Sequence, residues 1–380
     1  MSRASEQVAL GTIAREWGRI GCVGFGGPPT HIALLRDLCV RRRRWVSETD
    51  FEDAIAACNL LPGPASTQLA IYCAWRLRGR AGALVGGLSF IGPGLILIIA
   101  LAALFLSAAP PRWVLGAGAG AGAAVAAVAA HAGATLTPAS WGRAARKIRW
   151  GAYLVAGAVS AATVGPWLVL VLLACGAAEL ALQRTVRSVS GAWVPLAATA
   201  GTGGLLSLSW VAFKVGALSY GGGFVIIPLM QADAVGRYHW LTAGQFLNAV
   251  ALGQVTPGPV VQTVAVVGYA AAGVGGALLA AVVAFSPSFA FILAGGSRFD
   301  AIRADRRARS FLDGAGPAAI GAIFGSCVPL TRALQEGWQY GVLAAAAIAL
   351  LVLRRGVVPT LVAAGAIGSI VALAGGPLPR

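Results

Sequence analysis

Charged residues are scarce in this 380-residue chain, at 11% of the sequence, and only 13 residues are acidic. Hydrophobic residues make up 58%, and the mean hydropathy is +0.78. A soluble globular domain needs far more polar cover, so this composition excludes one and indicates several membrane spans. The apolar segments are long and continuous rather than alternating, which argues against a barrel. The sequence therefore predicts an all-α polytopic membrane protein.

The chain also lacks the motifs of several functional classes. Its six cysteines form no CxxC pair and no Cys/His cluster, so neither a disulfide framework nor a metal site is predicted. No nucleotide-binding loop and no arrangement of catalytic-triad residues is present. These absences argue against an ATP-driven pump and against a membrane enzyme, and no cofactor is predicted.

The charge that is present is strongly positive. The net charge is +16, and nearly all of the basic residues are arginine. In a membrane protein this excess is typical of cytoplasmic loops that face anionic lipid, which places the chain in the cytoplasmic (inner) membrane. A nucleic acid or another anionic macromolecule is the alternative partner, and the membrane character of the chain favours lipid.

The two halves of the sequence repeat each other. Sliding the chain by 195 residues aligns a set of unusual residues, and an offset of 194 continues the match further on. The aligned pairs include Gly21 with Gly216, Gly26 with Gly221, Gly27 with Gly222, Trp45 with Trp240, Pro62-Gly63-Pro64 with Pro257-Gly258-Pro259, and Pro93 with Pro287. Chance does not easily align two PGP triplets, two glycine runs and two tryptophans in one register. The chain therefore consists of two homologous halves.

Each half contains two apolar runs, and Gly and Pro interrupt them. The runs are residues 6–40, broken at 24–28; 48–78, broken at 62–64; 210–237, broken at 216–223; and 242–271, broken at 257–259. Gly is costly in a helix and Pro lacks an N–H donor, so a helix cannot continue through these breaks. Within a membrane, such backbone is tolerated only where it is buried in protein or lines a cavity. Re-entrant helical hairpins and pairs of tilted short spans are the two geometries that remain open.

The arginines distinguish the two halves. They flank both ends of both runs in the first half, whereas Arg237 and His239 are the only basic flanks in the second. The positive-inside rule then predicts that the first pair of hairpins enters from the cytoplasm and the second from the opposite side. An extra linking span at 191–209 would produce this inversion between an N-terminal repeat at 1–190 and a C-terminal inverted repeat at 210–380. The predicted fold is two inverted-topology repeats with broken or re-entrant helices.

Broken helices at matched positions of inverted halves predict a substrate site near the middle of the membrane. Free N–H groups and the positive end of the helix dipole favour an anion there. The candidate backbone donors are Gly26, Gly27, Gly63, Gly221, Gly222 and Gly258. Close helix crossing is the alternative reason for these glycines.

Two basic residues precede the glycine breaks at repeat-related positions. They are Arg19 and Lys214, and a cation inside a membrane segment is costly unless it is paired or faces water. No carboxylate is expected at a matching depth, so a bound anion is the expected counter-charge. Snorkelling of the two side chains to the interface is the alternative.

Further polar residues lie near the second break of each half. The candidate hydrogen-bond partners of an oxygen ligand are Asn59, Ser66, Thr67, Gln68, Asn248, Gln254, Thr256, Gln262 and Thr263, with interhelical contacts as the alternative. Four residues are candidates for proton coupling, namely His31, Glu52, Asp53 and Glu179. An interface role is favoured for His31, and helix capping is favoured for Glu52 and Asp53.

The motifs at these breaks resemble those of the chromate ion transporter family in its long, two-domain form. The first half carries Gly24-Phe25-Gly26-Gly27-Pro28 with His31, and Leu61-Pro62-Gly63-Pro64 with Gln68. The second half carries Tyr220-Gly221-Gly222-Gly223 and Thr256-Pro257-Gly258-Pro259. The resemblance covers nearly the whole chain. One departure is Gly18, where the family usually has a bulkier apolar residue.

The resemblance implies two halves of opposite orientation and proton-driven export of chromate, with sulfate as the isosteric physiological oxyanion. A tetrahedral dianion matches two cations and backbone N–H groups from both halves. An importer of sulfate or another oxyanion, a passive anion channel and a structural scaffold remain the alternatives. The coupling ion and the oligomeric state, including a homodimer, are left open by the sequence.

Overall fold

The computed structural model describes residues 8–59, 61, 63–163, 168–183, 204–219, 224–295 and 306–379, and all regular elements in these ranges are helices. The first half contains α1 (Leu10–Val23), α2 (Pro28–Arg36), the π-helix η1 (Asp37–Arg42), α3 (Glu48–Cys58), α4 (Ala65–Phe105), α5 (Arg112–Ala123), α6 (Val125–Arg143), α7 (Lys147–Thr163) and α8 (Leu168–Gln183). The second half contains α9 (Leu205–Leu218), α10 (Ile226–Gln231), the π-helix η3 (Ala232–Arg237), α11 (Ala243–Val255), the 3-10 helix η4 (Val260–Gln262), α12 (Thr263–Gly295), α14 (Arg306–Arg332), α15 (Gly337–Ala347), the π-helix η6 (Ile348–Val352) and α16 (Val357–Leu373). The predicted all-α class is confirmed.

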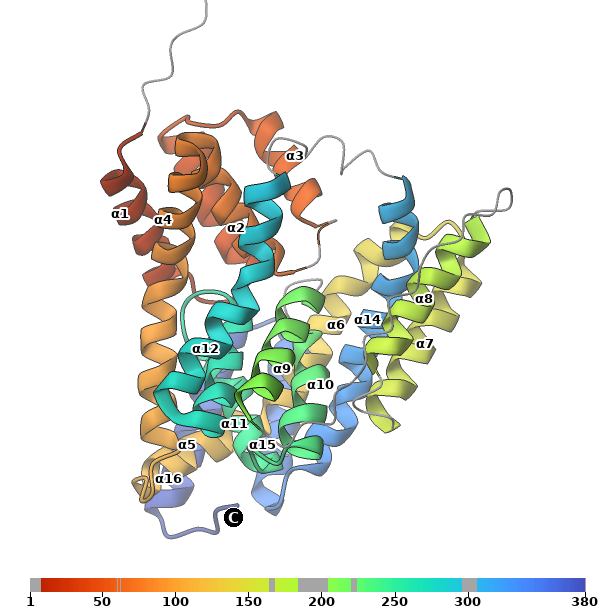
Figure 1. Cartoon of the computed structure of the whole chain (residues 1–380). Helices are drawn as coiled ribbons and strands as arrows, with labels where there is room; N and C mark the ends of the chain where they lie inside the picture. Colours follow the sequence, from red (N-terminus) through yellow and green to blue (C-terminus); the bar gives the residue numbers. More distant parts are fainter. Residues whose placement is uncertain are drawn as a thin grey trace, which may run out of the picture.

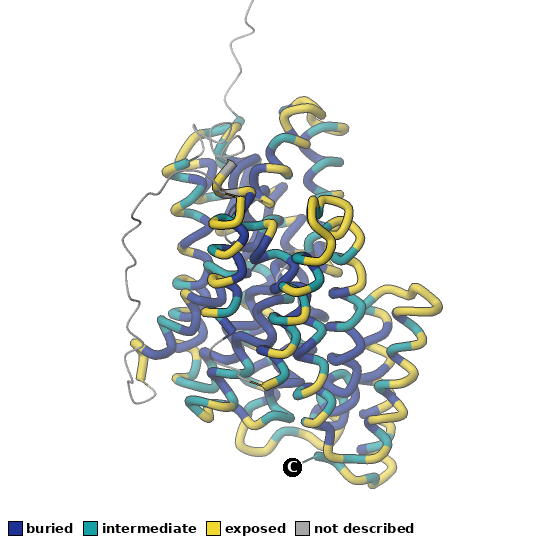
Figure 2. Tube along the Cα trace, turned by 90° about the vertical axis from the view of Figure 1, so that its right-hand side faces the viewer, coloured by how far each residue is buried: buried dark blue, intermediate teal, exposed yellow. Residues whose placement is uncertain are grey.

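Several of these helices suit a membrane. Among the described residues, four segments are long and apolar enough to cross one, namely Ala65–Phe105, Arg112–Arg143, Val260–Gly295 and Arg309–Arg332. Buried residues run along the inside of the bundle, and exposed residues cover its turns and outer faces (Figure 2). Large apolar side chains are among the exposed ones, including Leu88 and Ile96 on α4 and Val282 on α12. Such a surface is unfavourable in water and matches contact with lipid chains.

The helices of the first half break where glycine and proline predicted, whereas α9 continues through Gly216 to Leu218, past the predicted start of its break at 216. Residues 24–27 separate α1 from α2, and Gly26 and Gly27 there have φ of +92° and +78°. Residues 59–64 separate α3 from α4, and Gly63 has φ of +118°. A side chain with a Cβ is strained in this region of φ, so the local backbone path depends on glycine.

The backbone repeats its unusual conformations at the spacing of the sequence repeat. Both halves contain a π-helix after the first break and a kink inside the long helix that follows the second break. The matched positive φ values are +118° at Gly63 and +102° at Gly258, +58° at Gly79 and +59° at Gly273, and +50° at Arg44 and +53° at His239. Two homologous halves therefore share local structure as well as sequence.

The two long helices α4 and α12 run in opposite directions in Figure 1. The short helices α1, α2 and α3 lie at the upper end of the molecule, whereas α9, α10 and α11 lie in its lower half. After its kink, α4 descends toward α5, and after its own kink α12 ascends to the upper end.

Close helix packing holds each first limb against the long helix of its own half. α1 packs on α4, and α9 packs on α12. A Cβ at Gly21 would collide with the carbonyl oxygen of Phe90, and one at the equivalent Gly216 would collide with that of Ala284. Glycine at these two positions therefore allows backbone-to-backbone contact, which is the usual basis of helix association in membranes. α4 and α12 also contact each other, so the two halves meet along their long helices.

The predicted linking span cannot be compared in full with the structure. Residues 191–203 lie outside the described residues, and residues 205–209 form the beginning of α9. The domain limits at 190 and 209 therefore stay predictions.

Candidate functional site

The broken segments of the two halves touch each other in crossed pairs. The N–H of Gly258, in the second break of the second half, donates to the carbonyl oxygen of Gly24, in the first break of the first half, at 3.0 Å. The repeat-related contact is similar: a Cβ at Gly63, in the second break of the first half, would lie 3.4 Å from the carbonyl oxygen of Gly216 on α9. The second break of each half therefore lies next to the first broken helix of the other half.

The long helices α4 and α12 also pack against the breaks of the opposite half. Gly94 follows Pro93 inside α4, and its repeat equivalent Ser288 follows Pro287 inside α12. A Cβ at Gly94 would overlap the carbonyl oxygen of Pro257, which belongs to the break of the other half. In the same way, the hydroxyl oxygen of Ser288 lies 3.2 Å from the position of a Cβ on Gly63. Both halves thus build the same central junction.

Buried polar atoms without a partner gather around the junction. Five side-chain atoms near the breaks are buried and have no hydrogen-bond partner in the described part of the chain: Thr67 Oγ1, Ser219 Oγ, Gln254 Nε2, Gln262 Oε1 and Ser288 Oγ. Leaving a buried donor or acceptor unsatisfied costs about 1–3 kcal/mol each. Such groups call for an explanation, and a polar ligand is one of the ordinary explanations.

Three of these five atoms belong to residues of the predicted site, Thr67, Gln254 and Gln262. Ser288 escaped sequence reasoning because a serine in an apolar helix is usually a packing or capping residue. The repeat did carry a signal for it, since Ser288 follows the proline that aligns with Pro93. Ser219 is the repeat equivalent of Gly24 and precedes the second glycine run.

Lys214 is buried and already has a counter-charge. Its ammonium on α9 forms an ion pair with Oδ2 of Asp233 on η3, and the two side chains are 10% and 2% exposed. The ammonium also lies 5.8 Å from the centre of the Trp210 ring. The expectation that no carboxylate lies at the depth of this cation is wrong. Asp233 reaches it because α10 packs back on α9 after the break, and η3 follows α10 directly.

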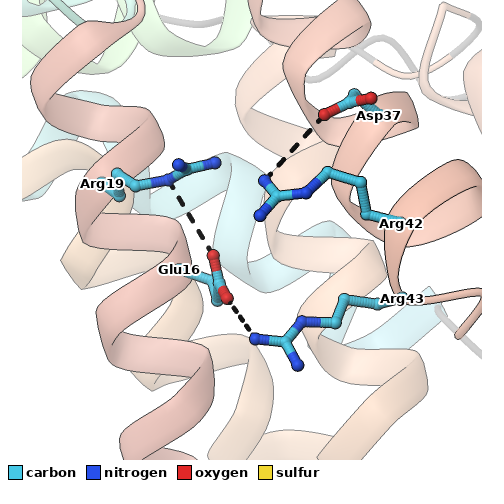
Figure 3. Close-up of polar contacts among 5 residues, drawn as sticks. All are labelled: Glu16, Arg19, Asp37, Arg42 and Arg43. Carbon is cyan, nitrogen blue, oxygen red and sulfur yellow. Dashed lines mark hydrogen bonds and ion pairs between the residues drawn. The ribbon is translucent and has the colours of Figure 1, made fainter.

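Arg19 is in a different situation from its repeat equivalent. Its side chain is 54% exposed, and its Nε lies 3.9 Å from Oε2 of Glu16. Glu16 is largely buried and also accepts a hydrogen bond from Nη2 of Arg43 at 2.7 Å (Figure 3). The expectation that no carboxylate lies at the depth of the cation is wrong for Arg19 too, because Glu16 lies one turn before Arg19 on the same face of α1. Lys214 is therefore buried in an ion pair, whereas the repeat-related Arg19 is exposed.

The remaining predicted ligands fall into two groups. Gly26, Gly27, Gly63 and Gly258 lie in the breaks with positive φ, and Gln68 is fully buried beside Gly63. Asn248 packs against Gly118 and Gly122 of α5, the hydroxyl of Thr256 donates to the carbonyl of Leu252 at 2.9 Å, and Asn59 is exposed at the end of α3. Gly221 and Gly222 lie outside the described residues.

Among the proton-coupling candidates, His31 lies at the junction. It is fully buried, its Nε2 donates to the carbonyl oxygen of Gly24 at 2.9 Å, and its Nδ1 lies 3.3 Å from Oγ of Ser66. Because a carbonyl only accepts, Nε2 must carry a hydrogen. This histidine therefore fixes the same carbonyl that binds Gly258.

The acidic candidates lie elsewhere. Glu52 pairs with Arg36 and is exposed, and Asp53 follows it in the first half of α3. Glu179 is held by Tyr153 at 2.9 Å, by Gln183 at 2.8 Å and by Arg149 at 3.2 Å. That cluster belongs to α7 and α8, on the side of the molecule away from α1 and α4 (Figure 1). The structure does not bring these carboxylates to the breaks.

Comparison with known proteins identifies relatives over most of the chain. A model of the family described as "Chromate transporter" matches residues 11–180 and 206–370. The chain is 33% identical to the chromate transport protein of Cupriavidus metallidurans over 361 residues, which cover 92% of this chain and 89% of the relative. It is 31% identical to the chromate transport protein of Pseudomonas aeruginosa over 341 residues, 84% of this chain and 80% of the relative. No solved structure matches it. The two separate matches of one family model agree with the repeat.

Proposed function

Because this chain belongs to the chromate transporter family, we propose that it is a secondary active transporter that exports chromate, or the isosteric sulfate dianion, by alternating access. It is a transporter and not an enzyme. The relatives' name supports the substrate, and the central junction supports the mechanism. We place the protein in the cytoplasmic membrane with protons as the coupling ion.

One observation carries the proposed site, the crossed contact of the breaks through Gly258 and Gly24. A tetrahedral oxyanion needs several hydrogen-bond donors that approach from different directions. The junction offers the hydroxyls of Thr67, Ser219 and Ser288 and the amide of Gln254. Free N–H groups at the helix starts and the cations Lys214 and Arg19 complete the set of donors.

Alternating access requires two halves that move against each other around the site. The opposite directions of α4 and α12 in Figure 1 support inverted repeats, and the arginines around the first-half breaks support a cytoplasmic entry for that half. The different exposure of Arg19 and Lys214 supports a state open on the side of the first half only. Outward movement of a dianion is also favoured by an inside-negative potential, by about 4.6 kcal/mol per 100 mV.

Flux measurements in proteoliposomes test the proposal. We expect labelled sulfate and chromate to accumulate against their gradients when a pH gradient is imposed, and each anion to compete with the other. A passive channel would equilibrate the anions without accumulation, and an importer would accumulate them with the opposite orientation of the gradient. Absence of flux of either oxyanion would refute the proposed function.

A further inference from the structure

The ion pair of Lys214 and Asp233 joins the helices before and after the glycine break of the second half. Lys214 lies five residues before Ser219, the start of the break, and Asp233 follows the break on η3. Oδ2 of Asp233 contacts the ammonium, whereas Oδ1 is buried and no group in the described residues hydrogen-bonds to it. A carboxylate in this position loses water around one oxygen without gaining a protein donor, which costs free energy. Protonation of that oxygen would remove the charge and lower the cost.

The surroundings leave few other ways to balance this charge. η3 packs against α10 and α11, which contain no charged residue, and α9 contributes Lys214 alone. On η3 itself, Arg237 lies with its guanidinium 5.2 Å from the centre of the Tyr238 ring. Lys214 is therefore the one cation on these neighbouring helices, and it can neutralise one negative partner at a time.

The first half has no copy of this pair. The 195-residue shift places Leu38 at the position of Asp233 and Arg19 at the position of Lys214. Arg19 instead pairs with Glu16 on its own helix. A feature that only one half has is not required by the repeated architecture, and a buried ion pair is by itself weak evidence for a stabilising role. A role in transport explains why the acidic residue is there.

We propose that Asp233 is the proton carrier of this transporter, and that it releases Lys214 to the oxyanion when it takes up a proton. This inference rests on the proposed function. Without substrate, the ammonium pairs with the ionised carboxylate. When a dianion enters, the carboxylate takes a proton from water, and the ammonium leaves it and binds the anion. Release of the anion restores the original pair and returns the proton on the same side, so the cycle carries one proton with each dianion, and the inside-negative potential drives the net negative charge outward.

Electrostatics links the two events. An ionised Asp233 and a dianion near one ammonium repel each other strongly, because interior charges are poorly screened. A proton on Asp233 removes this repulsion, so the proton and the anion bind together. The same coupling makes binding of the anion depend on pH, and binding should strengthen as pH falls.

Proton uptake during sulfate binding tests this directly. Sulfate is the probe because it stays a dianion near neutral pH. We would titrate the purified full chain with sulfate in buffers of different ionisation enthalpy and measure the heat of binding by calorimetry. The wild type should take up about one proton per sulfate. Asp233→Asn should still bind sulfate but take up none, and Asp233→Glu should restore the uptake.

Asp37→Asn provides the matched control. Asp37 begins the equivalent π-helix of the first half, is about half exposed and lies 4.0 Å from Arg42 (Figure 3). Its variant should take up protons like the wild type. A wild type that binds sulfate without proton uptake would overturn the inference, even if Asp233→Asn does not fold. Unchanged uptake in a folded Asp233→Asn would overturn it as well. Failure of the wild type to bind either oxyanion would instead refute the proposed function, and the inference would fall with it.

Discussion

A methyl group added at Gly94 should drive the two halves apart at their junction. Gly94 lies in α4 directly after Pro93 and is buried against the second break of the other half. The Cβ of Gly94→Ala would overlap the carbonyl oxygen of Pro257 and lie 2.6 Å from Nε2 of Gln262. The first obstacle is backbone, which cannot rotate away as the end of a side chain can. Either α4 or the break must move.

The size of the effect follows from three contributions. Overpacking of a tight interior costs about 1–3 kcal/mol. Displacing Pro257 also breaks the hydrogen bond that Nε2 of Gln262 donates to its carbonyl at 2.6 Å, worth about 1 kcal/mol. Alanine gains up to about 1 kcal/mol over glycine in a helix. The net destabilisation of Gly94→Ala is therefore about 1–3 kcal/mol.

Gly92 provides a control on the same helix. A Cβ at Gly92 would meet no atom within 4 Å, so Gly92→Ala should keep its helix propensity gain, up to about 1 kcal/mol, without a collision. We would compare both variants with the wild type by thermal unfolding in detergent and by sulfate flux in proteoliposomes. Gly94→Ala should unfold at a lower temperature and lose most of its flux, while Gly92→Ala should match or exceed the wild type. Equal stability and flux in the two variants would refute the crossed packing of the breaks.

Three further predictions concern the site and the topology. Arg19→Ala should abolish oxyanion efflux and leave thermal stability unchanged, because an exposed ion pair contributes about 0–1 kcal/mol; wild-type efflux would remove Arg19 from the site. Ser288→Ala should weaken sulfate binding by about 1.5 kcal/mol, roughly tenfold in Kd. Ser286 is the control, because its exposed hydroxyl donates to the carbonyl of Val283 at 2.8 Å. Ser286→Ala should therefore bind sulfate normally in the same titration. In a cysteine-free background, single cysteines placed beside Trp45 and beside Trp240 should react with an impermeant thiol reagent from opposite sides of the membrane, and labelling from the same side would contradict inverted repeats.

Local chemistry explains why much of the architecture was predictable. Gly and Pro interrupt helices through effects confined to their own residues, so the breaks at Gly26, Gly27 and Gly63 could be predicted from the local sequence alone. The repeat aligns Gly258 with Gly63, and the φ values of the two residues, +102° and +118°, are similar. The long apolar runs likewise predicted helices of membrane length, because lipid leaves the backbone no other partner.

Side-chain partners were not predictable in the same way. Whether Arg19 and Lys214 lack a counter-charge depends on which groups the folded chain brings beside them. Glu16 was one turn away on the same helix, and Asp233 returned only after a break and a short helix. Side-chain burial could not be predicted either, because the repeat-related side chains of Arg19 and Lys214 are 54% and 10% exposed.

By itself, the sequence determined that this is a helical membrane protein of two homologous halves, each broken twice, because hydrophobicity and helix breaking act over a few neighbouring residues. Only the tertiary structure decided that Gly258 binds Gly24, that Ser288 lies at the first-half break and that Asp233 seals Lys214. Those contacts join residues far apart along the chain or across a break, and they depend on how whole helices pack. The chemistry of the site comes from that packing.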